Sequence, residues 1–578
     1  MRAKKYFIGI SLGFNSAAAC CDDKGQLIAA ISEERLIREK NTKHIPINAL
    51  SHVYPGHDAE IEPVLTYSHY DYLDKAYFTK YEPLYLWDDR LDADGNLLKF
   101  VNSKCIGYHF ERVHRVEHHT AHAYSVFPYY KVPKNSLILT SDGYGDGASQ
   151  TIRHVSDMYH PWISGWYGTK DSLALVYQFV TGALGLKMHQ HEGKVTGLAA
   201  YGDIAQARML LDSLYAQYSN TMYRWDYKCK SFQELQRDIF AFCNQWLGRT
   251  IEQMGPLSIE DTKVTALCKM AQLFVEQEMV KRLSSISSHK KYHLFLAGGL
   301  FANVKLNTLI SSSSDFLSVN VAPPMGDEGT AVGAALARFA PKKIAKGCFN
   351  NVFSGVNMTD SSPHVSCDER EFMYKTHITT FYDEKDLIKL MAKMLAEGEI
   401  IHYRSGVSEF GPRALCHSTT FYQPNNPDGT KYLNRTLGRS EYMPYAPIIL
   451  DKDVDKIFIR NKKLDKTNQY MTAVLLVKPD IDVLKDYAGA VHVDRTARPQ
   501  ILYDKKSFAY KLLTEYKRLT GRLMLINTSW NIHNNPTVAL VDDSKLTWMQ
   551  SGFCGAALVH DKTMYVKKGE NHEDSLPV

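Results

Sequence analysis

The sequence lacks the features that mark several large classes of protein. Its 10 cysteines include no Cys-x-x-Cys pair, which argues against a zinc ribbon or a disulfide framework and predicts reduced thiols in a cytoplasmic protein. The 68 Lys and Arg residues nearly balance the 63 Asp and Glu residues, so the sequence predicts no basic face for nucleic acid or an acidic membrane. No apolar run is long enough to span a bilayer. These absences favour a small-molecule partner.

The composition is that of a globular protein. Hydrophobic residues make up 44% and charged residues 23% of the 578 positions, enough for about three to four domain-sized units or for two large bilobal domains. The N-terminus has a basic start and an apolar stretch, as a secretory signal does, but Gly9, Gly13 and Asn15 interrupt it. The alternation that follows predicts strands over residues 6–11, 17–21 and 26–32 instead.

Strand, glycine turn and helix follow one another at several places in the first part of the chain. The predicted strands 136–140, 292–296 and 318–321 are each followed by a glycine-containing turn, and helices are expected from residue 301 and over 330–339. This arrangement presents backbone N–H groups and acidic side chains at the ends of strands, where phosphates and metals bind. The sequence contains no internal repeat.

The domain organisation follows from a change in pattern. Residues 1–345 alternate strand-like and helix-like stretches, residues 346–371 are polar and aperiodic, and residues 372–578 form a second α/β region that begins with an amphipathic helix over 385–397. We therefore predict two α/β domains joined by a linker at 346–371.

Two histidines and two aspartates form a candidate metal site. His118 and His122 stand one helical turn apart and project from one face, although a polar helix face explains such a pair equally well. Asp142 follows a predicted strand and Asp327 lies in a turn before a helix, where each could also serve as a turn or cap residue. Together the four side chains suit a divalent iron, manganese or similar ion that acts as a Lewis acid.

Glycine turns and arginines provide candidate phosphate sites. The residues that could approach a nucleotide are Gly143, Gly145, Gly298, Gly299 and Gly326, with Asn303 either bonding adenine or ribose or capping its helix. In the second region Arg413, Arg439 and Arg498 lie at Gly or Pro turns, where guanidinium groups suit a phosphate, although most arginines are solvated surface residues. Asn527 and Ser529 add donors after a predicted strand over 523–526.

The sequence as a whole resembles the NodU/CmcH-type O-carbamoyltransferases. The motifs that carry the resemblance run in order over nearly the whole chain: ISEERLIREK, EHHTAHA, SDGYGDG, EGKVTGLAAYG, LAGGLFAN, PPMGDEGTAVGAA, SEFGPRAL, LNRTLGRSEYMPYAP, TARPQ and NTSWN. The resemblance implies an actin/sugar-kinase-like (ribonuclease H-like) N-terminal domain and a YrdC-like C-terminal domain. It also implies an enzyme that makes carbamoyl-adenylate from carbamoyl phosphate and ATP and passes the carbamoyl group to a hydroxyl of a natural product or sugar.

The resemblance assigns roles to the candidate residues. An iron-type metal, with Mn²⁺ or Mg²⁺ as alternatives, would be held by His118, His122, Asp142 and Asp327. Lys40 and the Gly298–Gly299 turn would contact ATP or the adenylate. Carbamoyl phosphate would be held by Arg413, Arg439, Arg498, Asn527 and Ser529.

The chain departs from the family pattern at informative positions. Many relatives carry a histidine where this chain has Phe14, so the general base expected there is missing. His119 is our candidate for that base, and the alternative is a structural residue hydrogen-bonded behind the metal ligands. Cys416 stands where relatives usually carry glycine after Gly-Pro-Arg-Ala-Leu, and Asn534-Asn535 replaces a common Gly-Glu.

The sequence bears on two alternative functions, carbamoyl transfer to a macromolecule and nucleotide binding without catalysis. Carbamoyl transfer to tRNA or to a hydrogenase-maturation partner is disfavoured by the near-neutral charge and by the missing Cys-x-x-Cys pairs. An actin-like nucleotide-binding scaffold without turnover would have no use for the histidine pair. We expect loops over residues 55–99, with Tyr81, Tyr85 and Trp87, and 203–261 to select the acceptor alcohol or to be packed inserts. The oligomeric state is open, with a homodimer as the commonest outcome.

Overall fold

The computed structural model describes residues 4–56, 59–67, 113–146, 148–158, 163–167, 171–222, 232–284, 286, 290–344, 346–347, 349–360, 364, 366–439 and 443–568. Tyr81, Tyr85 and Trp87, which we considered for acceptor selection, lie outside these residues. Within them, no helix combines the length and the apolar composition needed to cross a bilayer.

The first sheet has five strands in the order β3-β2-β1-β4-β5. Its strands are β1 (Lys5–Leu12), β2 (Ala17–Asp22), β3 (Leu27–Ser32), β4 (Glu60–Tyr67) and β5 (His114–Arg115). The first three strands pair antiparallel, whereas β4 and β5 run parallel to β1. The strands predicted over 6–11, 17–21 and 26–32 are confirmed, and the short helices α1 (Glu34–Ile37) and α2 (Ile47–Val53) follow them.

The second sheet repeats this topology. Its strands are β6 (Ser136–Gly145), β7 (Ala148–His154), β8 (Ile163–Tyr167), β9 (Tyr292–Ala297) and β10 (Phe316–Val321), in the order β10-β9-β6-β7-β8. Again the first three strands are antiparallel and the last two join parallel to the first. A duplicated five-stranded unit of this order is the actin/sugar-kinase-like, ribonuclease H-like arrangement, so the expected fold is confirmed. The repeat exists in topology although none is visible in the sequence.

The residues predicted as a turn over 141–147 belong mostly to β6. The strand continues to Gly145, and its pairing with β7 shifts register between Ser141 and Gly145. A bulge of this kind bends the strand and redirects its side chains, which matters for Asp142 below.

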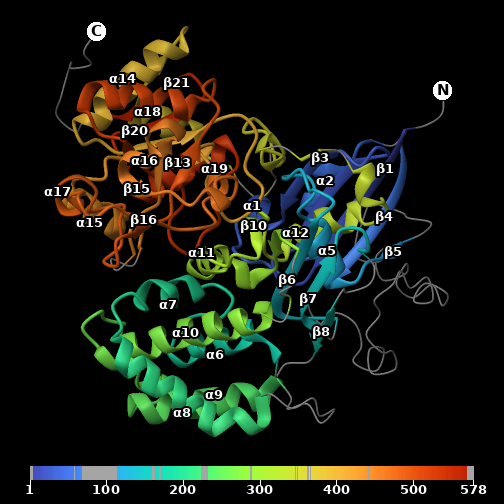
Figure 1. Ribbon diagram of the computed structural model, residues 1–578. Helices are drawn as coiled ribbons and strands as arrows, with labels where there is room; N and C mark the ends of the chain where they lie inside the picture. The colour runs from blue at the N-terminus through green and yellow to red at the C-terminus, as the bar shows by residue number, and fades with distance from the viewer. Residues whose placement is uncertain are drawn as a thin grey trace.

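Two helices fill the space between the sheets. Helix α5 (His118–Tyr124) and helix α12 (Glu328–Leu336) contribute to one buried apolar cluster together with residues of β1, β2, β6 and β9 (Figure 1). A Cβ built on Gly333 of α12 would lie 1.6 Å from the Ala121 carbonyl oxygen of α5, so only glycine allows these helices to approach so closely.

A mainly helical region is inserted between β8 and β9. It consists of α6 (Leu173–Ala183), α7 (Glu192–Leu198), α8 (Ile204–Met222), α9 (Phe232–Leu247) and α10 (Thr262–Ser284), and it lies at the bottom of Figure 1. Helix α11 (Val304–Ser311) follows β9. The helix expected from residue 301 therefore begins three residues later, because Asn303 caps it.

The C-terminal region is built on an eight-stranded mixed sheet in the order β11-β21-β20-β12-β13-β19-β14-β18. The strands are β11 (Thr376–Thr380), β12 (Ile401–Arg404), β13 (Ser418–Tyr422), β14 (Pro447–Leu450), β18 (Gln500–Leu502), β19 (Met524–Ser529), β20 (Ala557–His560) and β21 (Thr563–Lys567). A small sheet is formed by β15 (Phe458–Ile459), β16 (Leu475–Val477) and β17 (Thr496–Ala497). The helices are α13 (Glu369–Lys375), α14 (Glu384–Ala396), α15 (Pro427–Thr436), α16 (Val454–Ile457), α17 (Val483–Asp486), α18 (Phe508–Thr520) and α19 (Val541–Gln550).

The N- and C-terminal regions are joined by buried hydrogen bonds. The Arg35 guanidinium of α1 donates to the Thr537 carbonyl at 3.1 Å and to the Gly411 carbonyl at 3.0 Å. Asn307 of α11 donates to the Thr472 carbonyl at 2.8 Å. The domain boundaries at 345 and 371 stay predictions, but these contacts show that the two regions form one packed body.

Candidate active site

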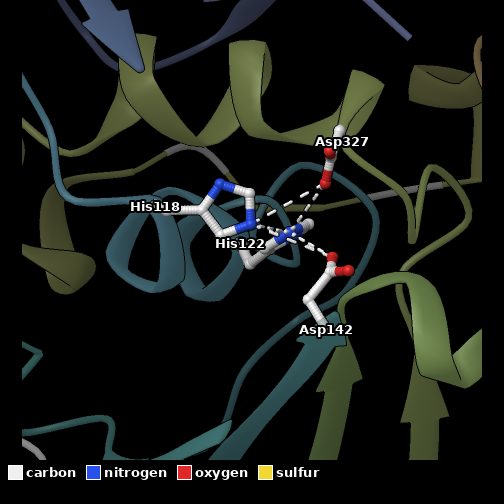
Figure 2. Close-up of side chains that lie close together, drawn as sticks. All are labelled: His118, His122, Asp142 and Asp327. Carbon is white, nitrogen blue, oxygen red and sulfur yellow. Dashed lines mark hydrogen bonds and ion pairs between the residues drawn. The ribbon is translucent and has the colours of Figure 1, made fainter. Parts of the chain in front are cut away.

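The four candidate metal ligands converge on one point between the two N-terminal sheets (Figure 2). The Nε2 atoms of His118 and His122 lie 3.0 Å apart, and Asp142 Oδ2 is 3.0 Å from His122 Nε2. Asp327 Oδ1 is 3.4 Å from the same nitrogen and 3.7 Å from His118 Nε2. Both imidazoles are almost completely buried, whereas the carboxylates keep some exposure. One cation at this point could therefore contact all four side chains and still be reached by a substrate.

Helix α5 is held at its N-terminus by carboxylates. The Glu117 side chain accepts from the backbone N–H groups of His119 at 2.9 Å and Thr120 at 2.7 Å. Asp146 accepts from the His118 N–H at 2.8 Å. Buried Arg153 pairs with Glu117 at 3.1 Å. These bonds satisfy the first N–H groups of the helix and fix the direction in which both histidines point.

Backbone groups orient the two aspartates. Asp142 accepts from the N–H of Gly143 at 2.6 Å and of Gly299 at 3.0 Å. Asp327 stands at the N-cap of α12, yet its side chain makes no cap hydrogen bond. Instead Ser11 Oγ donates to its carbonyl at 3.1 Å, and the carboxylate faces the histidines. The Asp327 side chain therefore does not cap helix α12, which was the alternative role considered for it.

Two of the predicted glycines have a steric reason at this site. Gly145 lies against the His118 ring, and a Cβ built there would be 2.1 Å from His118 Cδ2. Gly298 has a φ of +105°, and a Cβ there would meet the Ser141 carbonyl oxygen at 2.2 Å. Gly145 and Gly298 therefore shape the group of four candidate ligands, His118, His122, Asp142 and Asp327, which we call the metal cluster. This holds whether or not the two glycines also touch a nucleotide.

The histidines and aspartates of the site each favour the charged form of the other. Burial lowers the pKa of His118, but the nearby carboxylates of Asp142 and Asp327 outweigh it and raise the pKa to about 9. Burial alone would raise the pKa of Asp142, whereas His118 and His122 bring it well below its usual range. No Lys or Arg of the described residues pairs with either aspartate. Two imidazoles and two carboxylates without another counter-ion fit a divalent first-row metal.

His119 does not fit the role of a proton acceptor. Its side chain is fully buried, and its Nδ1 and Nε2 atoms lie 2.9 Å from Thr140 Oγ1 and 3.0 Å from the Ala148 carbonyl oxygen. Burial lowers its pKa to about 3. We therefore withdraw the catalytic assignment, since a substrate hydroxyl cannot reach either nitrogen. The geometry supports the alternative, in which His119 ties α5 to β6 and β7.

The predicted nucleotide residues are divided between two places. Asn303 Oδ1 accepts from the Leu306 N–H at 3.1 Å and its Nδ2 donates to Gln272 at 2.8 Å, so its amide is used as a helix cap. Gly326 lies beside Asp327, in the turn before α12. Lys40 lies at the other place, near the C-terminal region, where burial and then the charges of Arg439 and Arg35 outweigh Glu34 and lower its pKa. Contacts of these residues with ATP stay predictions.

The three arginines of the C-terminal region come together without an ion pair to a carboxylate of the described residues, although the Glu328 charge acts on Arg413. Burial, and then the charges of Arg413 and Arg439, lower the pKa of Arg498 well below its usual value. Burial also lowers the pKa of Arg413, to about 10. None of the three forms an ion pair with a carboxylate of the described residues. Three half-buried guanidinium groups that repel one another form a site suited to an anion.

Asn527 and Ser529 lie within β19, which extends past the strand predicted over 523–526, and they lie beside and behind these arginines. Arg439 donates to the Ser529 carbonyl oxygen at 2.9 Å and to its Oγ at 3.1 Å. Asn527 is fully buried, and its Nδ2 donates to the Ala414 carbonyl at 3.0 Å and to Gln500 Oε1 at 2.7 Å. Asn527 therefore holds the backbone next to Arg413, and its direct contact with carbamoyl phosphate stays a prediction.

Family models match both regions of the chain. The model of the carbamoyltransferase N-terminus matches residues 6–336, and that of the carbamoyltransferase C-terminus matches residues 392–567. The chain belongs to the carbamoyltransferase family. It is an enzyme of the carbamoyl-transfer class, which excludes the scaffold without turnover.

Relatives of this carbamoyltransferase occur in bacteria and archaea. Nodulation protein NolNO of Sinorhizobium fredii is 28% identical over 97% of this chain and 80% of its own length. A Methanocaldococcus jannaschii protein of uncharacterised function is 25% identical over 94% of this chain and 97% of its own length. Nodulation protein U of Azorhizobium caulinodans is 28% identical over 45% of this chain and 43% of its own.

Solved structures align more loosely. The activator of the 2-hydroxyisocaproyl-CoA dehydratase from Clostridium difficile, with bound ADPNP, covers 59% of this chain and 95% of its own at 10% identity and a TM-score of 0.32. HypF in its phosphate- and nucleotide-bound form covers 30% of this chain and 21% of its own at 18% identity and a TM-score of 0.23. The fold assignment of the carbamoyltransferase rests on the strand order described above.

Several residues that support the site were not predicted. Arg153 lies in a strand with no motif, and its pairing with Glu117 is visible only once β7 and α5 are packed together. His191 and His533, from different regions, stack at a ring-centroid distance of 5.7 Å next to Lys194 and Lys40. Only Glu117 could have been found from the sequence, as the acidic residue before the histidine helix.

Proposed function

We propose that this carbamoyltransferase makes carbamoyl-adenylate from carbamoyl phosphate and ATP and passes the carbamoyl group to a hydroxyl of a natural product or sugar. The observation that carries the proposal is the contact of the arginine loop, residues 411–413, with the segments that follow β9 and β10, the second of which leads to Asp327. Arg413 donates to the Ala302 carbonyl at 3.3 Å, and a Cβ on Gly411 would lie 3.1 Å from the Pro323 carbonyl oxygen. The proposed anion site and the proposed metal site would thus face each other across one interface.

The arginines would bind and activate the phosphate substrate. Arg413, Arg439 and Arg498 would neutralise the phosphate of carbamoyl phosphate, and bidentate guanidinium contacts would fix its orientation. A carbamoyl-adenylate is a mixed anhydride that water destroys, so a site enclosed between two packed regions protects it. A divalent ion held by His118, His122, Asp142 and Asp327 would act as a Lewis acid on the phosphate of the adenylate.

Lys40 and its neighbours would bind the phosphates of ATP. The charges of Lys194, Lys40 and Arg439 all act on His533, so a row of positive side chains extends from Arg439 toward Lys40. A triphosphate laid along these side chains would replace their mutual repulsion by attraction. The glycines Gly143, Gly299 and Gly326 lie next to the metal cluster, where the α-phosphate of an adenylate would reach it.

The remaining expectations belong to this proposal. We infer that the metal is iron, that the acceptor is a small-molecule alcohol, and that neither nucleic acid nor a membrane is a partner. A cytoplasmic enzyme that tailors a natural product, as in antibiotic biosynthesis, would be consistent with the reduced thiols expected from the sequence, and a homodimer is the oligomer we expect.

The test is a set of omission reactions. Purified enzyme is incubated with ATP, carbamoyl phosphate and a panel of sugars and polyols, and AMP and carbamoylated products are followed by mass spectrometry. AMP that depends on both ATP and carbamoyl phosphate, with a product heavier by one carbamoyl group, is the expected result. AMP formation without carbamoyl phosphate, or carbamoylation without ATP, would contradict the proposed reaction.

A further inference from the structure

His189 is held by tertiary contacts with the segment after β1 and with helix α6. Its ring stacks on Phe14 at a centroid distance of 4.2 Å and an interplanar angle of 21°. On another side, His189 Nε2 lies 2.9 Å from Gln178 Nε2. Residue 189 is exposed to solvent, in contrast to His118, His119 and His122. It is therefore an imidazole that a substrate hydroxyl can approach.

The two contacts of His189 lead to the two aspartates of the cluster. Phe14 follows β1, whose Ser11 hydroxyl donates to the Asp327 carbonyl. Gln178 lies near Gly143, the residue after Asp142, because a Cβ built on Gly143 would be 4.0 Å from Gln178 Oε1. The His189 ring is thus held between the segment after β1 and helix α6, which adjoin the turn of Asp327 and the strand of Asp142 respectively.

The backbone of His189 is strained and tightly held. Its φ is +66°, in the left-handed region that non-glycine residues rarely adopt. Its N–H donates to Glu192 Oε1 at 2.5 Å, and its carbonyl accepts from Asn41 Nδ2 at 3.0 Å. Such a conformation is unfavourable for a non-glycine residue and persists where surrounding contacts impose it, commonly at functional sites.

We propose that His189 is the general base that takes the proton of the acceptor hydroxyl during carbamoyl transfer; the proposal rests on the proposed carbamoyl-adenylate reaction. The acceptor oxygen forms a bond to the carbamoyl carbon, and the bond from that carbon to the phosphate oxygen breaks. AMP leaves with that electron pair. The hydroxyl proton moves to His189 and then to solvent, so the charge and the atoms balance.

The neighbours of His189 suit this role. If the Gln178 amide is turned over, its Oε1 accepts from the Nε2–H of His189 and stabilises the imidazolium that forms when Nδ1 takes a proton. The Phe14 face is also favourable to a cationic ring. The charged groups near the ring are Lys43, whose Nζ lies 3.8 Å from the Phe14 centroid, and Glu192, whose pKa burial raises to about 6.

The test compares base-dependent with base-independent transfer. Enzyme supplied with ATP and carbamoyl phosphate is given either glycerol, an alcohol that must lose a proton, or hydroxylamine, a nucleophile strong enough to need no base. In His189→Gln we expect transfer to glycerol to fall about a hundred- to ten-thousand-fold. AMP formation and capture by hydroxylamine should stay within about twofold of wild type, because neither needs the base.

A second variant protects the test against misfolding. His189→Gly suits the left-handed φ, so it should fold well, lose transfer to glycerol and regain part of it when imidazole is added. His44→Gln changes an exposed histidine that pairs with Glu39 and should leave all rates unchanged.

Other outcomes would overturn the base role. These are normal glycerol transfer in His189→Gln, equal losses with glycerol and hydroxylamine, or no imidazole rescue. Failure of wild type to form AMP from ATP and carbamoyl phosphate would instead contradict the proposed function.

Discussion

Single side chains should decide whether the proposed metal site binds its ion. His118 and Asp327 approach the same point from α5 and from the turn before α12, and each supplies one of four ligand atoms. Removing either one should weaken metal binding by orders of magnitude while the buried core stays intact.

We therefore expect His118→Ala and Asp327→Ala to lose bound metal and carbamoyl transfer while keeping wild-type thermal unfolding. Metal content by elemental analysis and activity after chelation and re-addition of Fe²⁺, Mn²⁺ or Mg²⁺ are the measurements. Asp23→Asn, on an exposed turn, is the matched control. Full activity of a chelator-treated, metal-free sample would show that the cluster is not a metal site.

Arg498 should be needed only for the first step of the reaction, the formation of carbamoyl-adenylate. Because its charge faces Arg413 and Arg439 with no carboxylate of the described residues paired to it, a bound phosphate would be its counter-ion. Arg498→Ala should abolish adenylate formation but transfer normally from supplied carbamoyl-adenylate.

Arg498→Lys should restore the first step only in part, because a point charge lacks the planar fork of a guanidinium. The two half-reactions are measured as AMP formation and as product formation from the supplied adenylate. An equal loss of both in Arg498→Ala would argue against the division of labour between the regions.

At the scale of elements, α5 depends on one buried ion pair. Arg153 is fully buried and pairs with Glu117, which in turn caps the helix. Breaking a buried pair from one side leaves an unpaired charge and typically costs about 3–5 kcal/mol. We expect Arg153→Met to lose about that much stability in urea unfolding.

The double variant Glu117→Gln/Arg153→Met should recover part of the loss, because no charge is left unpaired. Lys389→Met removes an exposed pair with Asp386 and should cost less than about 1 kcal/mol. If Arg153→Met costs as little as Lys389→Met, the pair does not hold α5.

The loop after Arg413 contains a second strained residue. Cys416 has a φ of +76°, which explains why a glycine suits this position, and its thiol donates to Gln500 Oε1 at 3.3 Å. Both Cys416→Gly and Cys416→Ala lose the thiol, so their difference reports the backbone conformation together with the one methyl group that only alanine keeps.

We expect the Gly variant to be more stable than the Ala variant by about 1 kcal/mol, the reverse of the usual order. Urea unfolding of the two proteins side by side measures this difference. A more stable Ala variant would mean that the loop relaxes out of the left-handed region.

At the scale of the molecule, the interface between the two regions should respond to pH. Burial and the charges of Lys194 and Lys40 lower the pKa of His533 to about 4. The unfolded chain binds this proton near pH 6.5, whereas the folded protein resists it, so the stabilising effect is complete above pH 6.5 and is lost as pH falls toward 4.

Unfolding in urea at several pH values should therefore show stability falling below pH 6.5, with a shallower fall in His533→Gln. His377→Gln, an exposed histidine of β11, should keep the wild-type slope. An unchanged slope in His533→Gln would remove His533 as a contributor.

The sequence determined the parts of the site that depend on local pattern. The spacing of His118 and His122 follows from helical geometry, and Asp142 and Asp327 lie where strands and glycine turns meet. The arginines of the C-terminal region were found in the same way, because Gly and Pro mark the turns that carry them. The family motifs added the order of the two regions, and the strand order confirmed the fold.

Only the tertiary structure decided which residues meet across the fold. It buried His119 and Asn527, so that they support the site from behind, and it stacked His189 on Phe14 from a loop far along the chain. It also duplicated one sheet topology without any sequence repeat. These outcomes depend on long-range packing between sheets and between regions, and local patterns carry no information about contacts between residues distant in the chain.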